Sequence, residues 1–381
     1  MQTIHYLTHI TFDFGAISAL GSELRRCGIR KPLLMSDRGI ANVGLLAQCQ
    51  AQLADVEHGI FLDVPPNPTE SAVMAALAVY RAEHCDGLVA FGGGSVMDAA
   101  KGVAILAGNS HSTSLADYAT ILGGAAHIGT GTAPIIAIPT TSGTGSEVAR
   151  GAIIVLDDGR KLGFHNWNLM PKGAICDPEL TLGLPTGLTA ATGMDAIAHC
   201  IETYLNAPFN PPAEGIALDG LARGLASIEA ATHDGSDRMA RRNMMSAAMQ
   251  GAMAFQKGLG CVHSLSHALG SLSGHQLHHG TLNAVLLPAV LKFNAPVVGH
   301  KVQRLAREFD VASDASAAPI AAAVLALNER LKLPTGLAAM GLARSDFKHV
   351  IEHALVDHCH ATNPRTASAT DYAALLDESF T

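Results

Sequence analysis

The most constraining feature of this sequence is an alternation of two kinds of segment in its first half. Short runs of β-branched and aliphatic residues alternate with longer runs rich in alanine. The predicted strands cover residues 31–36, 59–64, 87–91, 135–138 and 153–156, and the predicted helices include residues 45–53, 69–82 and 96–106. Such alternation favours a parallel sheet covered by helices, so we predict a Rossmann-like α/β domain at the N-terminus.

The pattern changes after about Pro185, beyond which we predict only helices. These helices cover residues 190–204, 213–231, 237–254, 262–272, 282–294, 302–309 and 315–331, followed by two shorter ones that end near Phe380. A switch from alternating to purely helical segments indicates two domains. We therefore predict an α/β domain over residues 1–184 and an all-helical domain over residues 185–381.

The composition of the 381-residue chain excludes several classes of protein. Hydrophobic residues make up 48% and charged residues 15%, the opposite of the balance in a disordered chain. The net charge is −8, and the basic cluster Arg238, Arg241 and Arg242 is interpreted as a solvated helix face. We therefore expect no nucleic-acid partner. The longest apolar runs, such as residues 315–327, are shorter than the roughly 20 residues of a membrane span, so we expect no membrane partner.

The seven cysteines indicate a reducing environment. They are scattered, odd in number and contain no Cys-x-x-Cys pair, which is typical of reduced, buried thiols rather than of a disulfide framework. The N-terminal residues show neither the basic segment nor the apolar core of a secretory signal. We therefore expect a cytoplasmic protein.

A glycine-rich segment, Gly92–Ser95, directly follows the predicted strand 87–91 and opens a predicted helix. Glycines allow a ligand to approach the backbone, and the N–H groups at a helix N-terminus attract a pyrophosphate. The segment is not the G-x-G-x-x-G fingerprint, because Met97 stands where the third glycine would fall. The alternative is an ordinary strand-to-helix turn, with Ser95 as the N-cap and Asp98 as its N3 partner.

A second polar loop, Pro139–Glu147, follows the predicted strand 135–138. Its hydroxyls and glycines suit a phosphate or a ribose, because open α/β sheets bind ligands at the carboxyl ends of their strands. The alternative is an ordinary polar loop.

Asp37 ends the strand 31–36, where a carboxylate bonds a ribose 2′-hydroxyl and repels a 2′-phosphate, which favours NAD over NADP. The alternative role for Asp37 is that of a turn residue.

Histidine accounts for 19 residues, and five histidines lie between His263 and His279. Asp195 and His199 are four residues apart on a predicted helix and therefore share a face, as do His263 and His267. The cluster continues with histidines at positions 275, 278 and 279. One carboxylate with several imidazoles suits a divalent ion such as Fe(II) or Zn(II). The alternative is a set of core histidines, and the spacing leaves open which of them bind an ion.

These motifs resemble those of the iron-containing (group III) alcohol dehydrogenases over nearly the whole chain, from about Lys31 onward. The matching segments are PPNPT at 65–69, GGGSVMDAAK at 92–101, PTTSGTGSEV at 139–148, DPELT at 177–181, ATGMDAIAHCIE at 191–202, GCVHSLSHALG at 260–270 and HGTLNAVLLP at 279–288. The resemblance is specific because these motifs occur in order in one chain. It implies an α/β dinucleotide-binding domain followed by a helical metal-binding domain.

The resemblance also implies roles for individual residues. The implied metal ligands are Asp195, His199, His263 and His279. The implied NAD-binding residues are Asp37, Gly93, Gly94, Ser95, Asp98, Thr140, Thr141 and Lys161. The expected catalytic residues are His267, which is expected near the substrate, and Asp98. Because the stretch from His263 to His279 is about two residues longer than in many members, His278 is the alternative fourth ligand.

Members of this family transfer a hydride between an alcohol and NAD, and a bound metal acts as a Lewis acid on the substrate oxygen. We therefore expect an NAD-linked oxidoreductase with Fe(II), or with Zn(II) or another divalent metal, that interconverts a small alcohol and its aldehyde or ketone in the cleft between the domains. We also expect a homo-oligomer such as a homodimer. The alternatives are a maleylacetate reductase-like or glycerol dehydrogenase-like enzyme, and a non-catalytic NAD- or metal-binding protein.

Arg150 and Lys257 are candidates for recognising a charged substrate. Arg150 lies just past the second polar loop, and Lys257 lies six residues before His263. Two cations at one site favour a substrate that carries a carboxylate, sulfonate or phosphonate. The alternative is that Arg150 pairs with Glu147 and Lys257 extends into solvent.

Overall fold

The computed structural model describes residues 8–272, 274–275 and 277–381, and this part of the chain forms two compact units. The first unit comprises the chain up to Thr141 together with Gly145–Leu182. The second comprises Gly183–Thr381 together with the short segment Ser142–Thr144. The first is an α/β unit and the second is helical, as predicted from the sequence.

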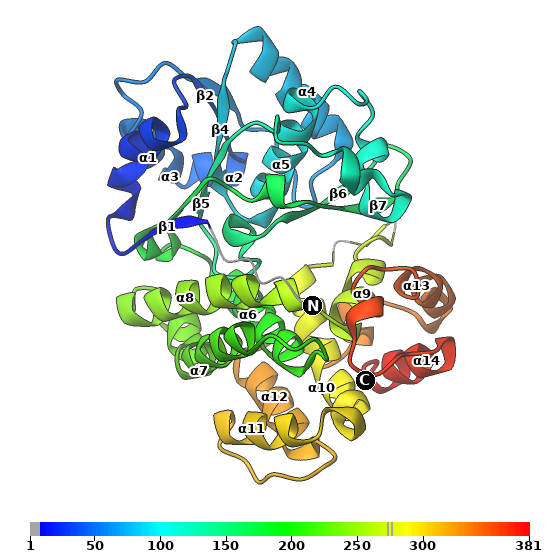
Figure 1. Cartoon of the computed structure of the whole chain (residues 1–381). Helices are drawn as coiled ribbons and strands as arrows, with labels where there is room; N and C mark the ends of the chain where they lie inside the picture. The colour runs from blue at the N-terminus through cyan, green and yellow to red at the C-terminus, as the bar shows by residue number, and fades with distance from the viewer. Residues whose placement is uncertain (1–7, 273, 276) are drawn as a thin grey trace. The chain divides into compact units, whose positions relative to one another are not determined.

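The α/β unit, in which Figure 1 labels strands β1, β2, β4 and β5, is built on a six-stranded sheet with the strand order β1-β8-β5-β4-β2-β3. Its strands are β1 (His9–Phe12), β2 (Pro32–Met35), β3 (Gly59–Phe61), β4 (Gly87–Gly92), β5 (Ile135–Pro139) and β8 (Gly173–Cys176). All neighbouring strands pair in parallel, which confirms the predicted parallel sheet. Because the strands are parallel, their carboxyl ends lie along one edge of the sheet.

Both faces of this sheet are buried, as is usual for a parallel sheet. In β4, Leu88 and Ala90 join a core cluster with residues of α4 and α5, whereas Val89 and Phe91 join a cluster with residues of α1 and α3. The helices of this unit are α1 (Leu20–Cys27), α2 (Arg38–Asn42), α3 (Leu45–Ala51), α4 (Glu70–Ala82) and α5 (Gly94–Gly108). Thr69 caps α4 by accepting a hydrogen bond from the backbone of Ala72, which confirms the predicted helix start.

The prediction that residues 153–156 belong to the parallel sheet is wrong. These residues lie in β6 (Gly151–Val155), which pairs antiparallel with β7 (Lys161–His165) in a separate two-stranded sheet. The turn between them contains Gly159 at φ +87°, a conformation that few other residues adopt. Side chains in β6 alternate between buried and half-buried, the pattern of a hairpin rather than of a strand covered on both faces. Strands β1, β7 and β8 were not predicted.

The helical unit contains no strand among its described residues. Its helices are α6 (Thr186–Leu205), α7 (Pro211–His233), α8 (Arg238–Ala254), α9 (Cys261–Leu269), α10 (His279–Val298), α11 (His300–Glu308), α12 (Ala318–Arg330), α13 (Phe347–Ala354) and α14 (Ala369–Glu378). The predicted helix 282–294 is longer than expected, since α10 begins at His279 and continues through Pro288 and Pro296. The earlier start places His279 in the first turn of the helix.

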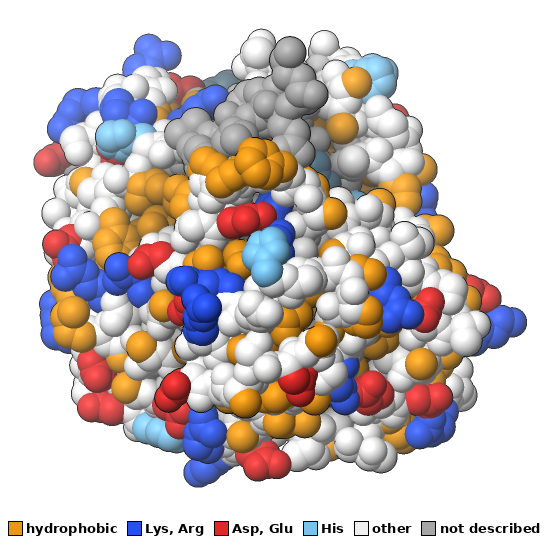
Figure 2. All heavy atoms as spheres, turned by 60° about the horizontal axis from the view of Figure 1, so that its bottom comes forward, with side chains coloured by type: hydrophobic (Ala, Val, Ile, Leu, Met, Phe, Trp, Pro, Cys, Tyr) orange, Lys and Arg blue, Asp and Glu red, His pale blue; other side chains and the backbone are white. Residues whose placement is uncertain are grey.

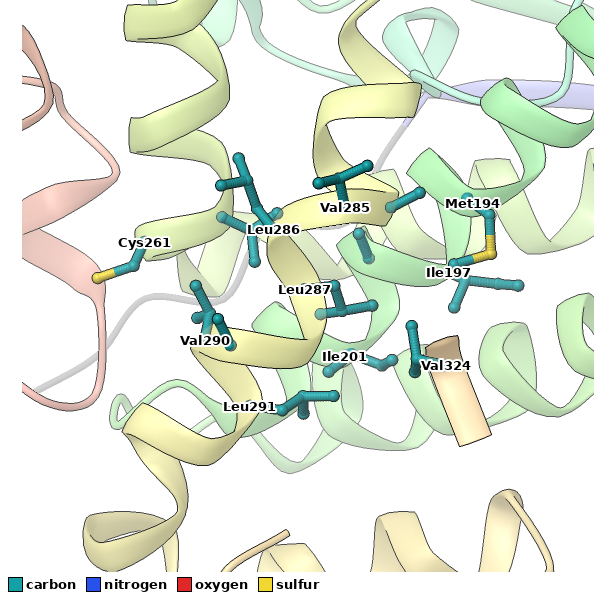
Figure 3. Packing of buried hydrophobic residues seen from close by; sticks show 14 of the residues in the cluster. Met194, Ile197, Ile201, Cys261, Val285, Leu286, Leu287, Val290, Leu291 and Val324 are labelled. Atoms are coloured by element: carbon teal, nitrogen blue, oxygen red, sulfur yellow. The ribbon is translucent and has the colours of Figure 1, made fainter. Parts of the chain in front are cut away.

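Helices α6 and α10 pack together in the core of this unit. Ile197 and Ile201 of α6, Leu287 of α10 and Val324 of α12 belong to one buried cluster, and their side chains lie close together in Figure 3. Helix α10 is long and apolar enough to cross a membrane, but 72% of its most apolar window is buried inside the structure. We therefore interpret α10 as a buried core helix, because core helices can be as long and as apolar as a membrane span.

Figure 2 shows one face of the molecule, which carries charged side chains of both signs. Acidic and basic side chains are interspersed on the face shown in Figure 2. The interpretation of the basic cluster as a solvated face is wrong for Arg241, which is buried and donates hydrogen bonds to Thr189 Oγ1 and to the carbonyl of Leu184. The hydrogen bonds of Arg241 therefore connect α8 to the start of α6.

Candidate metal centre and cofactor-binding edge

Four side chains from three helices converge in the helical unit. Asp195 and His199 lie one turn apart on α6, His263 lies on α9, and His279 is the first residue of α10. Asp195 Oδ1 is 3.7 Å from an Nε2 atom of each of the three histidines. The structure therefore brings together all four residues that the resemblance implies as metal ligands.

The separations in this cluster suit a shared ion. Two ligands that are each about 2.1 Å from one ion lie roughly 3.4 Å apart at a tetrahedral angle, close to the observed 3.7 Å. One carboxylate and three imidazoles form a donor set suited to Fe(II) or Zn(II). Asp195 is only 2% exposed and His263 only 1%, so an ion here would be largely shielded from water. The alternative ligand His278 is the exposed N-cap residue of α10.

A close approach of two helices places His279 beside Asp195. A Cβ atom at Gly280 would lie 2.1 Å from the backbone oxygen of Ala191 and 3.2 Å from Asp195 Cβ. The absence of a side chain at Gly280 therefore allows the start of α10 to touch α6. Gly251 of α8 does the same for His199, because a Cβ atom there would lie 3.0 Å from His199 Cβ.

The charges within the cluster oppose the effect of burial. Burial alone would raise the pKa of Asp195, but the neighbouring imidazoles, with His199 first, hold it well below its usual range. Burial would lower the pKa of His263, yet hydrogen bonds to Asp195 and Glu202 raise it to about 9. Burial lowers the pKa of His199 to about 4. The carboxylate is thus ionised and ready to bind a cation, which would displace the proton held by His263.

Glu202 contacts the predicted ligand His263, and it was not singled out from the sequence. Its Oε2 lies 2.5 Å from His263 Nδ1, and its Oε1 accepts a hydrogen bond from the backbone of Val262. A carboxylate on the far nitrogen of a ligating histidine sets the orientation of the ring and raises its basicity. Glu202 lies three residues after His199, one turn further along α6, and this spacing was a usable signal.

We predict that Glu202→Gln lowers the affinity for a divalent metal about 10- to 100-fold, because the amide orients the ring of His263 less firmly than the carboxylate does. Competition with a chromophoric chelator measures this affinity directly. Asp219→Asn removes an exposed carboxylate from α7 and serves as the matched control. Equal metal affinity in Glu202→Gln and the unaltered protein would contradict the assignment.

Asn283 is a second residue that was missed. Its Nδ2 lies 2.7 Å from Asp195 Oδ1 and 3.2 Å from Nε2 of both His263 and His279, while its Oδ1 is buried without a hydrogen-bond partner. Its position, one turn after His279, was the available signal. The amide packs directly against three of the four predicted ligands, so it helps to hold their donor atoms in place.

His267 lies next to the cluster but faces another group. Its ring stacks on that of His279 with centroids 5.4 Å apart, and its Nδ1 lies 3.0 Å from Asp357 Oδ2. His267 therefore contacts the cluster, but its Nδ1 faces Asp357 and not Asp195 Oδ1. The non-ligating position near the substrate that the resemblance implies for His267 stays a prediction.

Six of the eight residues predicted to bind NAD lie along one edge of the parallel sheet, whereas Asp98 lies within α5 and Lys161 lies at the start of β7. Asp37 follows β2, the segment Gly93–Ser95 follows β4, and Thr140–Thr141 follows β5. These three strands are adjacent, with β4 in the middle. The chain leaves β2 toward β3 and leaves β4 toward β5, in opposite directions, and this reversal is where open α/β sheets bind nucleotides.

The two loops at this edge touch. The backbone N–H of Thr140 donates to the carbonyl of Gly92, and a Cβ atom at Gly93 would lie 3.5 Å from the side chain of Thr141. Thr140 Oγ1 is buried without a hydrogen-bond partner, so it is available to a ligand. The Nζ of Lys161, at the start of β7, donates to Asn67 Oδ1. This edge suits a dinucleotide.

The structure corrects one capping interpretation and contains a second cap that was not predicted. Gly93 is the N-cap of α5, so the interpretation of Ser95 as N-cap with Asp98 as its N3 partner is wrong. Asp98 is half-buried and instead accepts hydrogen bonds from Ser146 Oγ and the backbone of Ile153. Asp98 therefore fastens α5 to the second loop, and its predicted roles toward NAD and catalysis remain predictions. Asp37 does cap α2, accepting from the backbone of Ile40, which leaves its second oxygen for a ligand.

Neither alternative for the two candidate cations is correct as stated. Lys257 does not reach solvent, because its buried Nζ donates to Glu214 Oε1 at 2.6 Å and to the carbonyl of Tyr204. This ion pair also removes Lys257 as a substrate-binding cation. Arg150 forms no ion pair with Glu147 in the described chain, and its guanidinium lies over the ring of Trp167, 4.6 Å from the centroid.

Comparison with known proteins relates both units to one family. A family model described as iron-containing alcohol dehydrogenase matches residues 8–178. A second model, described as Fe-containing alcohol dehydrogenase family, C-terminal, matches residues 189–380.

Individual relatives match over the whole chain. A 4-hydroxybutyrate dehydrogenase of Cupriavidus necator is 61% identical and covers 100% of both chains. Alcohol dehydrogenase 4 of Saccharomyces cerevisiae is 35% identical over 97% of this chain and 96% of the relative. The solved structure of a 1,3-propanediol oxidoreductase has a TM-score of 0.91 at 32% identity and covers 100% of both chains.

Proposed function

The chain belongs to the family of iron-containing alcohol dehydrogenases, and on that premise we propose that it oxidises a short ω-hydroxy carboxylate to the corresponding aldehyde, or catalyses the reverse reaction. The enzyme is an oxidoreductase, and its family implies NAD and a divalent metal. The observation that carries the proposed metal-dependent chemistry is the arrangement of three histidines around Asp195 Oδ1 in the helical unit. We propose Fe(II) as the ion, with Zn(II) as the alternative.

The residues of the chain have separate tasks in this reaction. Asp195, His199, His263 and His279 would hold the ion, and Glu202 orients His263. When bound, the ion supplies Lewis acidity toward the substrate oxygen and NAD accepts or donates the hydride. The glycine loop after β4 and the threonines after β5 would hold the dinucleotide. His267, kept in one orientation by Asp357, would hold or pass on the proton of the alcohol.

We predict that Asp37→Gly narrows the preference for NAD over NADP by about tenfold in kcat/KM, because it removes a charge that repels a 2′-phosphate. Glycine is tolerated at an N-cap, so α2 should lose only a few tenths of a kcal/mol. Asp37→Ser keeps the cap without the charge and should give the same shift. Equal efficiency with both cofactors in the unaltered enzyme would refute this role.

The substrate class rests on the 4-hydroxybutyrate dehydrogenase that is 61% identical over its full length. Such a substrate carries a carboxylate, which needs a cation. Lys257 is excluded by its ion pair with Glu214. Arg150 is half-buried over Trp167 and forms no ion pair among the described residues. We therefore propose Arg150 as the residue that binds the carboxylate.

Steady-state kinetics with matched alcohols test this function. With metal-loaded enzyme and NAD, we expect kcat/KM for 4-hydroxybutyrate to exceed that for 1-butanol roughly ten- to a hundredfold. This ratio corresponds to the binding free energy of one charge-assisted hydrogen bond. Arg150→Gln should reduce that ratio while leaving the rate with 1-butanol nearly unchanged. Arg160→Gln, which removes an exposed arginine from the same unit, is the matched control.

A neutral diol is the second candidate substrate, favoured by the likeness to 1,3-propanediol oxidoreductase. If 1,3-propanediol or 1-butanol matches 4-hydroxybutyrate in kcat/KM, the carboxylate proposal fails and the family activity stands. If none of these alcohols reduces NAD with metal-loaded protein, the proposed function itself fails.

The compartment and the assembly are further parts of the proposal. All seven cysteines are free thiols, and all except the half-buried Cys27 are buried, which supports a reducing compartment such as the cytoplasm. Assembly as a homodimer rests on the family resemblance alone.

A further inference from the structure

A second group of metal-binding side chains lies next to the first. Asp357, His358 and Cys359 are consecutive residues shortly after α13, and His267 of α9 faces them. One donor atom of each of these four residues lies within 4.8 Å of the donor atoms of the other three. None of the four is among the predicted ligands of the first centre, although His267 is also the residue proposed above to handle the proton of the alcohol.

The contacts within this group are short. His267 Nδ1 lies 3.0 Å from Asp357 Oδ2, and His358 Nδ1 lies 3.7 Å from the same oxygen. The other nitrogen of His358, Nε2, lies 3.4 Å from Cys359 Sγ. The group is thus as compact as the one at the first centre, where donor atoms of Asp195, His263 and His279 also lie within 4.8 Å of one another.

A hydrogen-bonded turn holds three of the four donors in place, and one of the four side chains is exposed to solvent. The backbone N–H of Cys359 donates to Asp357 Oδ1 at 2.8 Å, which fixes the turn that carries three of the donors. Helices α9 and α13 pack against each other, so His267 and the turn are held by the same pair of helices (Figure 1). The side chain of Cys359 is buried, whereas that of His358 is 39% exposed and offers an ion a path from solvent.

We propose that His267, Asp357, His358 and Cys359 form a second divalent-metal site, for an ion of the zinc class such as Zn²⁺, Cd²⁺ or Co²⁺. Sulfur, imidazole and carboxylate donors in a four-coordinate set suit these borderline and soft ions. On binding, the S–H bond of Cys359 breaks, a sulfur–metal bond forms, and the proton passes to solvent. The first centre contains no sulfur donor, so the two sites differ in the ions they favour.

This difference gives the second site its own optical signal. A thiolate bound to Cd²⁺ has a charge-transfer band in the ultraviolet that carboxylate and imidazole ligands do not produce. Titration of the metal-loaded enzyme with Cd²⁺ should therefore raise this band by one thiolate-bound equivalent per chain, even if Cd²⁺ also exchanges into the first centre. Equilibrium dialysis with metal analysis counts the ions independently.

Two variants and one control decide the outcome. Cys359→Ser should abolish the band. His358→Ala should weaken the affinity for Cd²⁺ by about tenfold or more, because even a residue that only hydrogen-bonds to a metal ligand contributes about that much. His358 is the most exposed of the four side chains, so its variant tests the site even if Cys359→Ser fails to fold. Cys27→Ser removes the half-buried thiol in the α/β unit and should leave the band intact. No band in the unaltered enzyme, a band that survives in a folded Cys359→Ser protein, or unchanged Cd²⁺ affinity in His358→Ala would overturn the proposal.

Discussion

Replacing His279 with alanine is expected to lower the affinity for a divalent metal at least a hundredfold, on the order of what losing one of four ligands costs. Its Nε2 is one of the three nitrogens 3.7 Å from Asp195 Oδ1, so the variant leaves a three-ligand site. The rate of alcohol oxidation should fall with metal content. His279 is partly exposed at the start of α10, so its removal should not unfold the chain.

The neighbouring histidine provides the matched control. His278 precedes α10 and its side chain is exposed, so His278→Ala should bind metal within about twofold of the unaltered protein. Metal content after dialysis against a weak chelator distinguishes the two variants. If His278→Ala loses the metal and His279→Ala keeps it, the ligand assignment is wrong at this position.

Gly280→Ala is expected to have the second large effect. A Cβ atom at this position would lie 2.1 Å from the backbone oxygen of Ala191, and neither backbone segment can move aside as a flexible side chain would. We expect a loss of about 3 kcal/mol or more in the free energy of unfolding, at the upper end of overpacking effects. The metal affinity should also fall more than about tenfold, because the start of α10 must shift away from Asp195.

A second glycine isolates the steric cause. Gly215 lies in α7, and a Cβ atom added there would meet no other atom within 4 Å, so Gly215→Ala should be neutral or stabilise the protein by up to about 1 kcal/mol. Denaturant unfolding of the two variants, with and without metal, measures both effects. Similar stability of Gly280→Ala and the unaltered protein would show that α6 and α10 do not depend on this close contact.

The central strands of the sheet and the pairing of Asp195 with His199 were predictable because local patterns determine them, whereas the choice of His263 and His279 as further ligands came from the family resemblance. The run at β4 is apolar throughout, as a strand covered on both faces must be, and Asp195 and His199 share a face through their spacing alone. Strand β8 has only four residues, which is too short for a periodic signal. Residues 153–156 were misplaced because the apolar content of β6 does not reveal its partner, and the turn at Gly159 selects β7.

The missed and mistaken site residues depend on contacts between distant segments. Glu202 contacts His263 only because α9 places that histidine beside α6. Asn283 contacts Asp195 only because α10 begins near α6. Lys257 lies close to His263 in sequence, but the short helical turn that carries it directs its ammonium group to Glu214 of α7. The short sequence separation placed Lys257 near His263, but it did not indicate in which direction the lysine side chain points.

The predicted ligands of the first centre come from α6, α9 and α10, so a single ion would join parts of the chain from position 195 to position 279. An ion that binds only the folded chain adds about 4 kcal/mol of stability when its concentration is roughly a thousand times Kd. Metal supply would then govern how long the protein survives as well as how fast it works. A cell short of the metal would hold a chain that opens more often and is removed sooner by proteases.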